Sequence, residues 1–233
     1  MAKNILVTGA AGNVGLQVTE DLLGAGHNVH ATVEPRNEAS QAQQLRQLPG
    51  SERLHIHPLD AMQEAEVAQF FRDQPAPFDG AALLAGGFAM KKLSQTSGDD
   101  LDRMLRLNFH TAFFCARELL QSMKDAGGGR IALIGARPAA EHEEGHGVAA
   151  YAFSKTLVRK LGALINDEGR SYGIIATVIS PDMVDTAPNR EAMPNARFGL
   201  WIKPAEISRL VQFALSEDVA RVHHPEFRLY GNP

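Results

Sequence analysis

The stretch Ile5–Gly15, "ILVTGAAGNVG", decides the fold of this 233-residue chain. A short apolar run leads into Thr8 and Gly9, and Gly12 and Gly15 follow at intervals of three. Glycines between a strand and a helix let the backbone approach a pyrophosphate, which the free N–H groups of the helix start then bind. The alternative is tight helix–strand packing without a ligand. We predict cofactor contacts by Thr8, Gly9, Gly12, Asn13, Val14 and Gly15.

The alternation of strand and helix that begins here continues to the end of the chain. Apolar runs of strand length are followed by segments with apolar residues at helical spacing. Because the strand runs are apolar on both faces, the sequence predicts an α/β fold: a doubly wound Rossmann fold with a parallel seven-stranded sheet and helices on both faces. The expected strands are 3–7, 28–33, 53–57, 80–84, 130–134, 174–179 and 227–230, and the expected helices are 14–23, 39–48, 62–71, 101–124, 149–168 and one that opens at Pro204.

Composition and charge narrow the class of protein. No stretch has the composition of a linker, so we expect a single domain over residues 1–233. The net charge of −4 comes without a basic block, which argues against a nucleic-acid partner. No apolar run approaches the roughly 18 residues of a membrane span. Cys115 is the only cysteine, so no intramolecular disulfide is possible and a cytoplasmic location is expected.

An acidic residue stands where a dinucleotide fold holds the adenosine ribose. Glu34 ends the second expected strand, about 20 residues past the glycines, and a carboxylate there accepts hydrogen bonds from the ribose hydroxyls. Its charge would repel a 2′-phosphate, so the sequence favours NAD(H) as the cofactor. Arg36 could instead pair with such a phosphate, which leaves NADP(H) possible. The alternative for Glu34 is a solvated position in a loop.

Tyr151 and Lys155, spaced as Y-x-x-x-K in the expected helix 149–168, indicate proton transfer. Side chains four residues apart share one face of a helix. A free tyrosine has a pKa of about 10, and a nearby ammonium stabilises the phenolate and lowers that pKa. We therefore expect Tyr151 to donate a proton to the substrate while a hydride reaches the neighbouring atom. Such a pair is common on helices, so this interpretation depends on the glycine turn as well.

With these motifs the chain resembles the short-chain dehydrogenase/reductase family over nearly its whole length. "LLAGG" (Leu83–Gly87) is similar to the family's Asn-Ala-Gly segment, and Ser180-Pro181 is similar to its Pro-Gly segment. The resemblance implies that Lys155 holds the nicotinamide ribose and that Asn108 positions a water beside it. It also implies a homodimer or homotetramer that assembles through the long helices. The cofactor contacts that it implies are Asp60, Ala85, Gly86, Gly87, Lys155, Pro181 and Thr186.

The sequence departs from the standard family pattern at the end of the fifth expected strand. "IALIGARPAA" (Ile131–Ala140) places Ala136 where standard members have a catalytic serine. The dihydropteridine-reductase-like branch is similar in this departure, in the glycine turn, in "AGGF" (Ala85–Phe88) and in the block Asp185–Trp201. The serine hydroxyl normally stabilises charge that develops on a carbonyl, so the substrate here should need less of that help. We expect an NAD(P)H-dependent oxidoreductase that acts on a small quinonoid, pterin-like or carbonyl substrate.

Segments outside the cofactor motifs supply the expected substrate contacts. Segment 182–201 holds apolar residues and prolines beyond the strand ends, which is typical of a substrate lid or of a loop that covers the core. Arg137, His142 or His146 could replace the donor that the missing serine would supply. The expected substrate contacts are Ala136, Arg137, His146, Met183, Met193 and Trp201.

His142, Glu143 and His146 also have the H-E-x-x-H spacing of a zinc peptidase. That zinc site needs both histidines on one face of a stable helix, whereas Gly145 and Gly147 interrupt this segment. We therefore expect a polar loop above the nicotinamide end of the cofactor, in which the imidazoles could contact the substrate, and we expect no metal site.

Two other functions are compatible with the same fold. One is a general short-chain carbonyl or 3-oxoacyl reductase, and the absence of a hydroxyl at Ala136 argues against it. The other is a non-catalytic NAD(P)-binding sensor. A sensor needs neither a proton donor nor its supporting residues, so the presence of Tyr151, Lys155 and Asn108 argues against that function.

Overall fold

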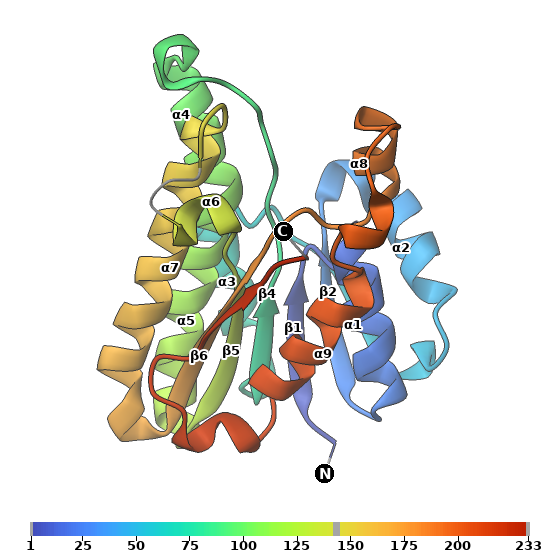
Figure 1. Ribbon diagram of the computed structural model, residues 1–233. Coiled ribbons are helices and arrows are strands. Elements are labelled where there is room, and N and C mark those ends of the chain that lie inside the picture. Colours follow the sequence, from blue (N-terminus) through green and yellow to red (C-terminus); the bar gives the residue numbers. More distant parts are fainter. Residues whose placement is uncertain (1, 142–144, 232–233) are drawn as a thin grey trace.

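A computed structural model describes residues 2–141 and 145–231 of the chain. Seven parallel strands form one sheet in the order β3-β2-β1-β4-β5-β6-β7, as Figure 1 shows for most of them. This arrangement confirms the predicted doubly wound fold, and the strand boundaries lie within two residues of those expected. The strands are β1 Asn4–Thr8, β2 Asn28–Val33, β3 Leu54–Pro58, β4 Gly80–Leu83, β5 Gly129–Ile134, β6 Ile174–Pro181 and β7 Glu226–Leu229.

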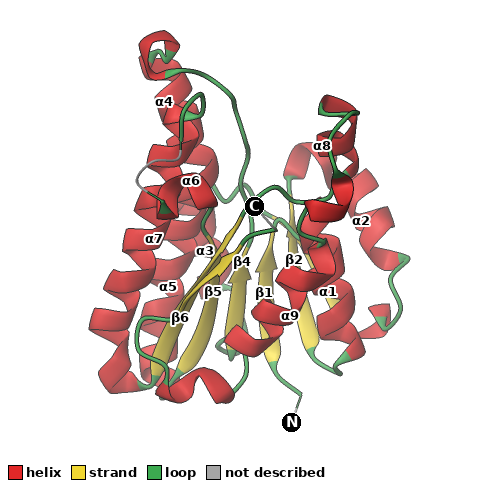
Figure 2. Cartoon of the chain, in the orientation of Figure 1, coloured by secondary structure: helices red, strands yellow, loops and turns green. Residues whose placement is uncertain are grey.

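Helices cover both faces of the sheet, so the core has two layers (Figure 2). One layer packs under α1 (Asn13–Gly24), α2 (Glu38–Arg46) and α9 (Pro204–Ala214). The other packs under α3 (Glu64–Arg72), α5 (Thr111–Ala126) and α7 (Ala149–Gly169). Shorter helices lie near the ends of the strands: α4 (Gly98–Met104), α6 (Arg137–Ala140) and α8 (Ala187–Ala192). No helix in the described part of the chain is long and apolar enough to span a membrane.

The expected continuous helix over residues 101–124 is wrong in one respect. The structure divides it into α4, a π-helical segment Leu105–His110, and α5. A π turn inserts one extra residue between hydrogen-bonded partners, and such turns are frequent at functional sites. Asn108 lies buried inside this segment. Apolar spacing could not show the extra residue, because the flanking turns keep the helical period.

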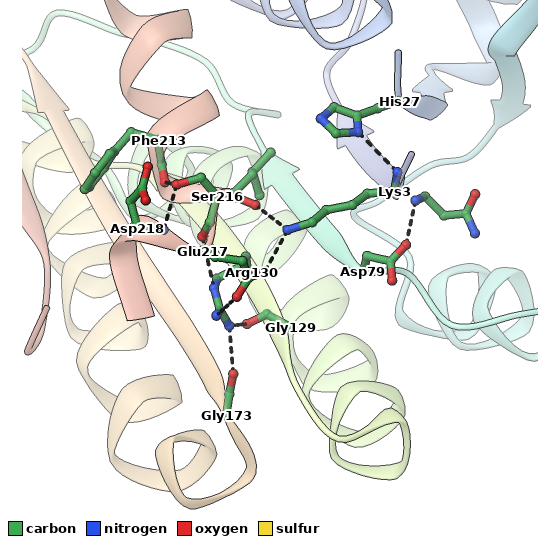
Figure 3. Close-up of polar contacts among 12 residues, drawn as sticks. Lys3, His27, Asp79, Gly129, Arg130, Gly173, Phe213, Ser216, Glu217 and Asp218 are labelled. Atoms are coloured by element: carbon green, nitrogen blue, oxygen red, sulfur yellow. Dashed lines mark hydrogen bonds and ion pairs between the residues drawn. The ribbon is translucent and has the colours of Figure 1, made fainter. Parts of the chain in front are cut away.

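A buried arginine joins several elements at the edge where the strands begin (Figure 3). Arg130, at the start of β5, donates to the carbonyl oxygens of Gly173 at 2.8 Å and Ser216 at 3.2 Å. It also pairs with Glu217 at 2.7 Å, and the same carboxylate pairs with Lys3 at 2.9 Å. Arg130 and Glu217 together thus connect the starts of β1, β5 and β6 with the end of α9, at the edge opposite the glycine turn.

Three histidines form a cluster on β2 and β3. The rings of His55 and His57 stack on His30 with centroids 4.6 and 5.3 Å away, and His30 Nδ1 lies 3.1 Å from His57 Nε2. Phe78 and Phe70 contact the cluster edge-on. Burial, reinforced by the neighbouring imidazoles, lowers the pKa of His30 to about 4 and also lowers the pKa of His57. The folded chain therefore resists protonation of this cluster.

This cluster should make stability depend on pH in the acid range. The unfolded chain binds a proton at His30 with a pKa of 6.5, whereas the folded chain does so only near 4. Protons therefore favour unfolding as the pH falls through that window, by on the order of 1–2 kcal/mol for this partly exposed ring. In urea unfolding at several pH values, His30→Phe should flatten the dependence, and His223→Phe, at an exposed position, should preserve it. An unchanged dependence in His30→Phe would contradict this assignment.

Candidate active site

The glycine turn after β1 has the close backbone contacts that its sequence predicts. Gly9 has a φ of +66°, and its carbonyl accepts a hydrogen bond from the N–H of Gly12 at 3.0 Å. A Cβ on Gly15 would lie 2.1 Å from that same carbonyl oxygen. Helix α1 then begins without a side-chain cap, so its first N–H groups stay available to a ligand. This cradle fits a dinucleotide pyrophosphate, because only glycines leave the backbone open there.

The loop after β4 lies against this turn and against the predicted catalytic residues. Thr8 Oγ1 accepts hydrogen bonds from the N–H groups of Leu84 at 3.1 Å and Ala85 at 3.2 Å. A Cβ on Gly86 would lie 2.5 Å from Asn108 Oδ1 and 3.5 Å from Lys155 Nζ. The structure therefore brings two sets of predicted residues to one edge of the sheet, one from the glycine turn and one from the π-helical segment Leu105–His110 and α7.

Tyr151 and Lys155 lie on the first turns of α7 beside the end of β5. The buried Lys155 Nζ donates to the Ile134 carbonyl at 2.9 Å and lies 6.0 Å from the centroid of the Tyr151 ring. Among the described residues the Tyr151 hydroxyl makes no hydrogen bond. Phe88 contacts the Tyr151 ring edge-on, with centroids 5.0 Å apart, although 57% of Phe88 is exposed. The tyrosine hydroxyl can therefore donate a hydrogen bond to a ligand or accept one from it.

Burial controls both pKa values at this pair. It raises the pKa of Tyr151 to about 12 and lowers the pKa of Lys155 to about 8. The expectation that the ammonium lowers the tyrosine pKa is wrong for the chain alone, because burial of the phenol disfavours its charged form. At neutral pH the phenol keeps its proton, and this is the form that a proton donor needs.

Asn108 holds the loop after β4 by both ends of its carboxamide. Its Oδ1 accepts from the Gly87 N–H at 3.0 Å, and its Nδ2 donates to the Gly87 carbonyl at 3.0 Å. The same Nδ2 donates to Ser154 Oγ at 3.2 Å. Sequence analysis missed Ser154 and Phe88. Ser154 lies within the Y-x-x-x-K motif, but only the fold reveals the partner of its hydroxyl.

Position 136, just after the end of β5, is an alanine and supplies no hydroxyl. Ala136 is buried and precedes α6. The next residue, Arg137, pairs with Asp182 at 2.7 Å and lies over the ring of Tyr230. The pair joins the ends of β5 and β6 at the edge that carries Tyr151.

The two predicted acidic contacts are already engaged by neighbouring residues. Glu34, after β2, accepts from Arg36 at 2.8 Å and Asn37 at 2.7 Å. Asp60, after β3, accepts from the Met62 N–H at 3.0 Å and from Gln63 at 3.2 Å. A carboxylate has further lone pairs, so both groups can still accept hydrogen bonds from a cofactor.

Segment 182–201 connects β6 to α9 and contains the short helix α8. Thr186 caps α8 by accepting from the Asn189 N–H at 3.4 Å. The segment is closed at its base, where the Met183 carbonyl accepts from the Ile202 N–H at 2.9 Å. Trp201 packs edge-on against Phe198, and Met183 and Met193 are partly buried. The short helix was not expected from the sequence, because its prolines obscure the helical spacing. Pro181 ends β6 beneath the segment.

The zinc motif of the sequence falls largely outside the described residues. His142 and Glu143 belong to residues 142–144, and His146 is exposed. Within the described ranges no group of three or more His, Cys, Asp or Glu residues is arranged to hold a metal ion.

A doubly wound sheet with an open glycine turn and a Tyr–Lys pair at one edge defines a dinucleotide-dependent oxidoreductase. The model of the short chain dehydrogenase family matches residues 3–197. A cyclopentanol dehydrogenase from a Comamonas species is 25% identical over 98% of this chain and 96% of its own. Two solved structures share the fold. A short-chain type dehydrogenase/reductase from Mycobacterium ulcerans superposes with a TM-score of 0.86 at 21% identity, covering 97% of this chain and 87% of its own. The structure of ElxO with NADP bound superposes with a TM-score of 0.87 at 19% identity, covering 98% of this chain and 97% of its own.

The chain therefore belongs to the short-chain dehydrogenase/reductase family, whose members are NAD(P)-dependent oxidoreductases acting on small molecules.

Proposed function

We propose that the protein is an NADH-dependent reductase of a small quinonoid or pterin-like heterocycle, similar to dihydropteridine reductase. The observation that carries this proposal is the pairing of a complete Tyr151–Lys155–Asn108 group with a buried Ala136. A ketone develops charge on its oxygen and benefits from a second hydroxyl donor. A conjugated ring spreads that charge over its own nitrogens, so one proton donor suffices.

The residues of the site divide the work between binding and proton transfer. The glycine turn and the start of α1 would bind the pyrophosphate, and Lys155 would bind the nicotinamide ribose. The bound nicotinamide supplies a hydride. Tyr151 donates the matching proton through its free hydroxyl, and the charge of Lys155 stabilises the phenolate that this leaves. Lys155 and a water positioned by Asn108 would then return a proton to the tyrosine.

Substrate contacts in this proposal come from Phe88, from segment 182–201 and from residues that follow β5. Phe88 packs on the Tyr151 ring and leaves much of its own surface exposed, which suits contact with a planar ring. Segment 182–201, with Met183, Met193 and Trp201, would close over the substrate as a lid. Ala136, Arg137 and His146 would contact the substrate as well.

The preference for NADH rests on Glu34. Its carboxylate stands at the end of β2, where the ribose hydroxyls of NADH would donate to it. The ion pair with Arg36 weakens this discrimination, because the guanidinium could turn toward a 2′-phosphate. We therefore expect NADH to be preferred and NADPH to be used more slowly.

The decisive experiment measures oxidation of NADH and NADPH with quinonoid dihydropterin and with a panel of ketones and 3-oxoacyl thioesters. The proposal expects the dihydropterin to be the best acceptor and NADH the better donor. Preferential reduction of a ketone or a 3-oxoacyl thioester would favour a general carbonyl reductase instead. Tight NADH binding without turnover of any acceptor would favour the non-catalytic sensor.

Activity should decline on the alkaline side because of Lys155. Burial lowers its pKa to about 8, so the ammonium that stabilises the Tyr151 phenolate is lost as the pH rises through that value. We expect kcat/KM for the reduction to fall about tenfold for each pH unit above about 8. A rate profile at saturating cofactor checks this. A rate that stays flat to about pH 10 would show that the charge of Lys155 is not needed.

We further propose a cytoplasmic homodimer, or a homotetramer built from it, that assembles through α5 and α7. These helices expose large apolar side chains, which are Phe113, Phe153, Leu157 and Leu164. Exposed apolar groups on two neighbouring helices mark a contact surface. Light scattering on the purified protein gives its molar mass, and Leu164→Arg should shift the protein toward the monomer. The lone buried Cys115 is compatible with a reducing compartment.

A further inference from the structure

Ser154 is a fully buried hydroxyl between the tyrosine and the cofactor-binding loop. Its Oγ donates to the Tyr151 carbonyl at 2.8 Å and accepts from Asn108 Nδ2 at 3.2 Å. Asn108 in turn accepts from the backbone N–H of Gly87 and donates to the backbone carbonyl of Gly87. We infer that Ser154 is a positioning residue, which sets the orientation of Asn108 and thereby the place of the Ala85–Gly87 loop beside the cofactor. This inference rests on the proposed cofactor binding.

The orientation of the Asn108 carboxamide follows from the single hydroxyl hydrogen of Ser154. A hydroxyl has one donor, and Ser154 uses it on the Tyr151 carbonyl, so its oxygen can only accept from Asn108. The Asn108 amide must therefore turn Nδ2, and not Oδ1, toward Ser154. In that orientation Oδ1 faces the Gly87 N–H and Nδ2 also reaches the Gly87 carbonyl. The reversed amide would place two donors together at Gly87 and would lose both hydrogen bonds.

The Ala85–Gly87 loop, which the Ser154–Asn108 hydrogen bonds hold, is packed too closely to move freely. A Cβ on Gly86 would lie 2.5 Å from Asn108 Oδ1 and 3.5 Å from Lys155 Nζ, so Gly86 lies close to both side chains. A shift of the Asn108 amide would therefore move the loop toward or away from the lysine. Because Ser154 and Tyr151 share one turn of α7, the hydrogen bonds from Ser154 through Asn108 also fix the distance between Tyr151 and this loop.

The test compares Ser154→Ala with Thr156→Ala. The Thr156 hydroxyl also donates to a carbonyl within α7, that of Ala152 at 2.9 Å, but it is exposed and does not contact Asn108. Both variants replace a hydroxyl with alanine in the same helix. Ser154→Ala leaves the buried Nδ2 of Asn108 with the Gly87 carbonyl and only a weak sulfur acceptor, Met104 Sδ at 3.9 Å. We therefore expect the Kd for NADH, measured by NADH fluorescence, to rise about tenfold. Thr156→Ala should bind NADH like the unmodified protein.

A double-mutant cycle separates positioning from a general loss of packing. If Ser154 acts through Asn108, Ser154→Ala should weaken NADH binding little further in an Asn108→Ala background, so the two effects do not multiply. Multiplying effects would overturn the inference. Ser154→Cys, which keeps a weak donor and acceptor, should lie between alanine and serine, and it replaces Ser154→Ala in the cycle if that variant does not fold.

The binding readout keeps this inference apart from the proposed function. Absence of NADH binding by the unmodified protein would contradict the proposed cofactor site. Binding that Ser154→Ala and Thr156→Ala leave equally unchanged would overturn only the role of Ser154, whatever acceptor the enzyme reduces.

Discussion

Tyr151→Phe should lower kcat for NADH-dependent reduction roughly 10²–10⁴-fold while leaving the Kd for NADH nearly unchanged. The substitution removes one oxygen and keeps the ring that Phe88 contacts. The hydroxyl makes no hydrogen bond to the described residues, so its loss leaves no buried partner unsatisfied. The effect should therefore fall on proton transfer and not on stability.

Three measurements on one preparation check this prediction. They are steady-state turnover with the best acceptor, NADH fluorescence, and the thermal midpoint of unfolding. Tyr172→Phe is a matched control, because Tyr172 lies on the surface between α7 and β6 and far along the chain from the glycine turn. Turnover that survives Tyr151→Phe within a factor of a few would assign the proton to another donor, with Arg137 the next residue to test.

Gly15→Ala should abolish cofactor binding and destabilise the fold by about 3 kcal/mol or more. The added methyl group would lie 2.1 Å from the Gly9 carbonyl oxygen and 2.9 Å from two backbone atoms of Ala10. No rotamer change relieves a clash with backbone, so either α1 or the turn must move. Either movement separates the turn from the helix start that together form the pyrophosphate cradle.

Gly24→Ala is the matched control in the same helix. Gly24 is exposed at the end of α1, and a Cβ there would meet nothing within 4 Å. Alanine should stabilise the helix by about 0.5–1 kcal/mol, because it loses less backbone entropy than glycine on folding. Urea unfolding and NADH fluorescence report on both variants. Gly15→Ala with unaltered binding would show that the turn does not hold the cofactor.

The sequence by itself determined the fold and the position of the glycine turn after β1. Apolar strands buried on both faces are recognisable from continuous apolar runs, and the helices between them are recognisable from their period. These signals are local, because each depends on burial of consecutive residues. Gly9 and Gly15 were recognisable for a related reason. A tight turn between a strand and a helix requires glycine where neighbouring backbone atoms pack closely, and those atoms lie within a few residues along the chain.

Only the tertiary structure decided how the proposed proton-transfer site is built. Ser154 contacts Asn108, although 46 positions of sequence separate them. The π-helical segment that buries Asn108 cannot be recognised from the spacing of apolar residues. The pKa of Tyr151 rises where the Tyr–Lys spacing predicted a fall, because burial outweighs an ammonium that is held by the Ile134 carbonyl. Hydrogen-bond partners and desolvation depend on atoms that come together only in the folded chain, so residue spacing cannot specify them.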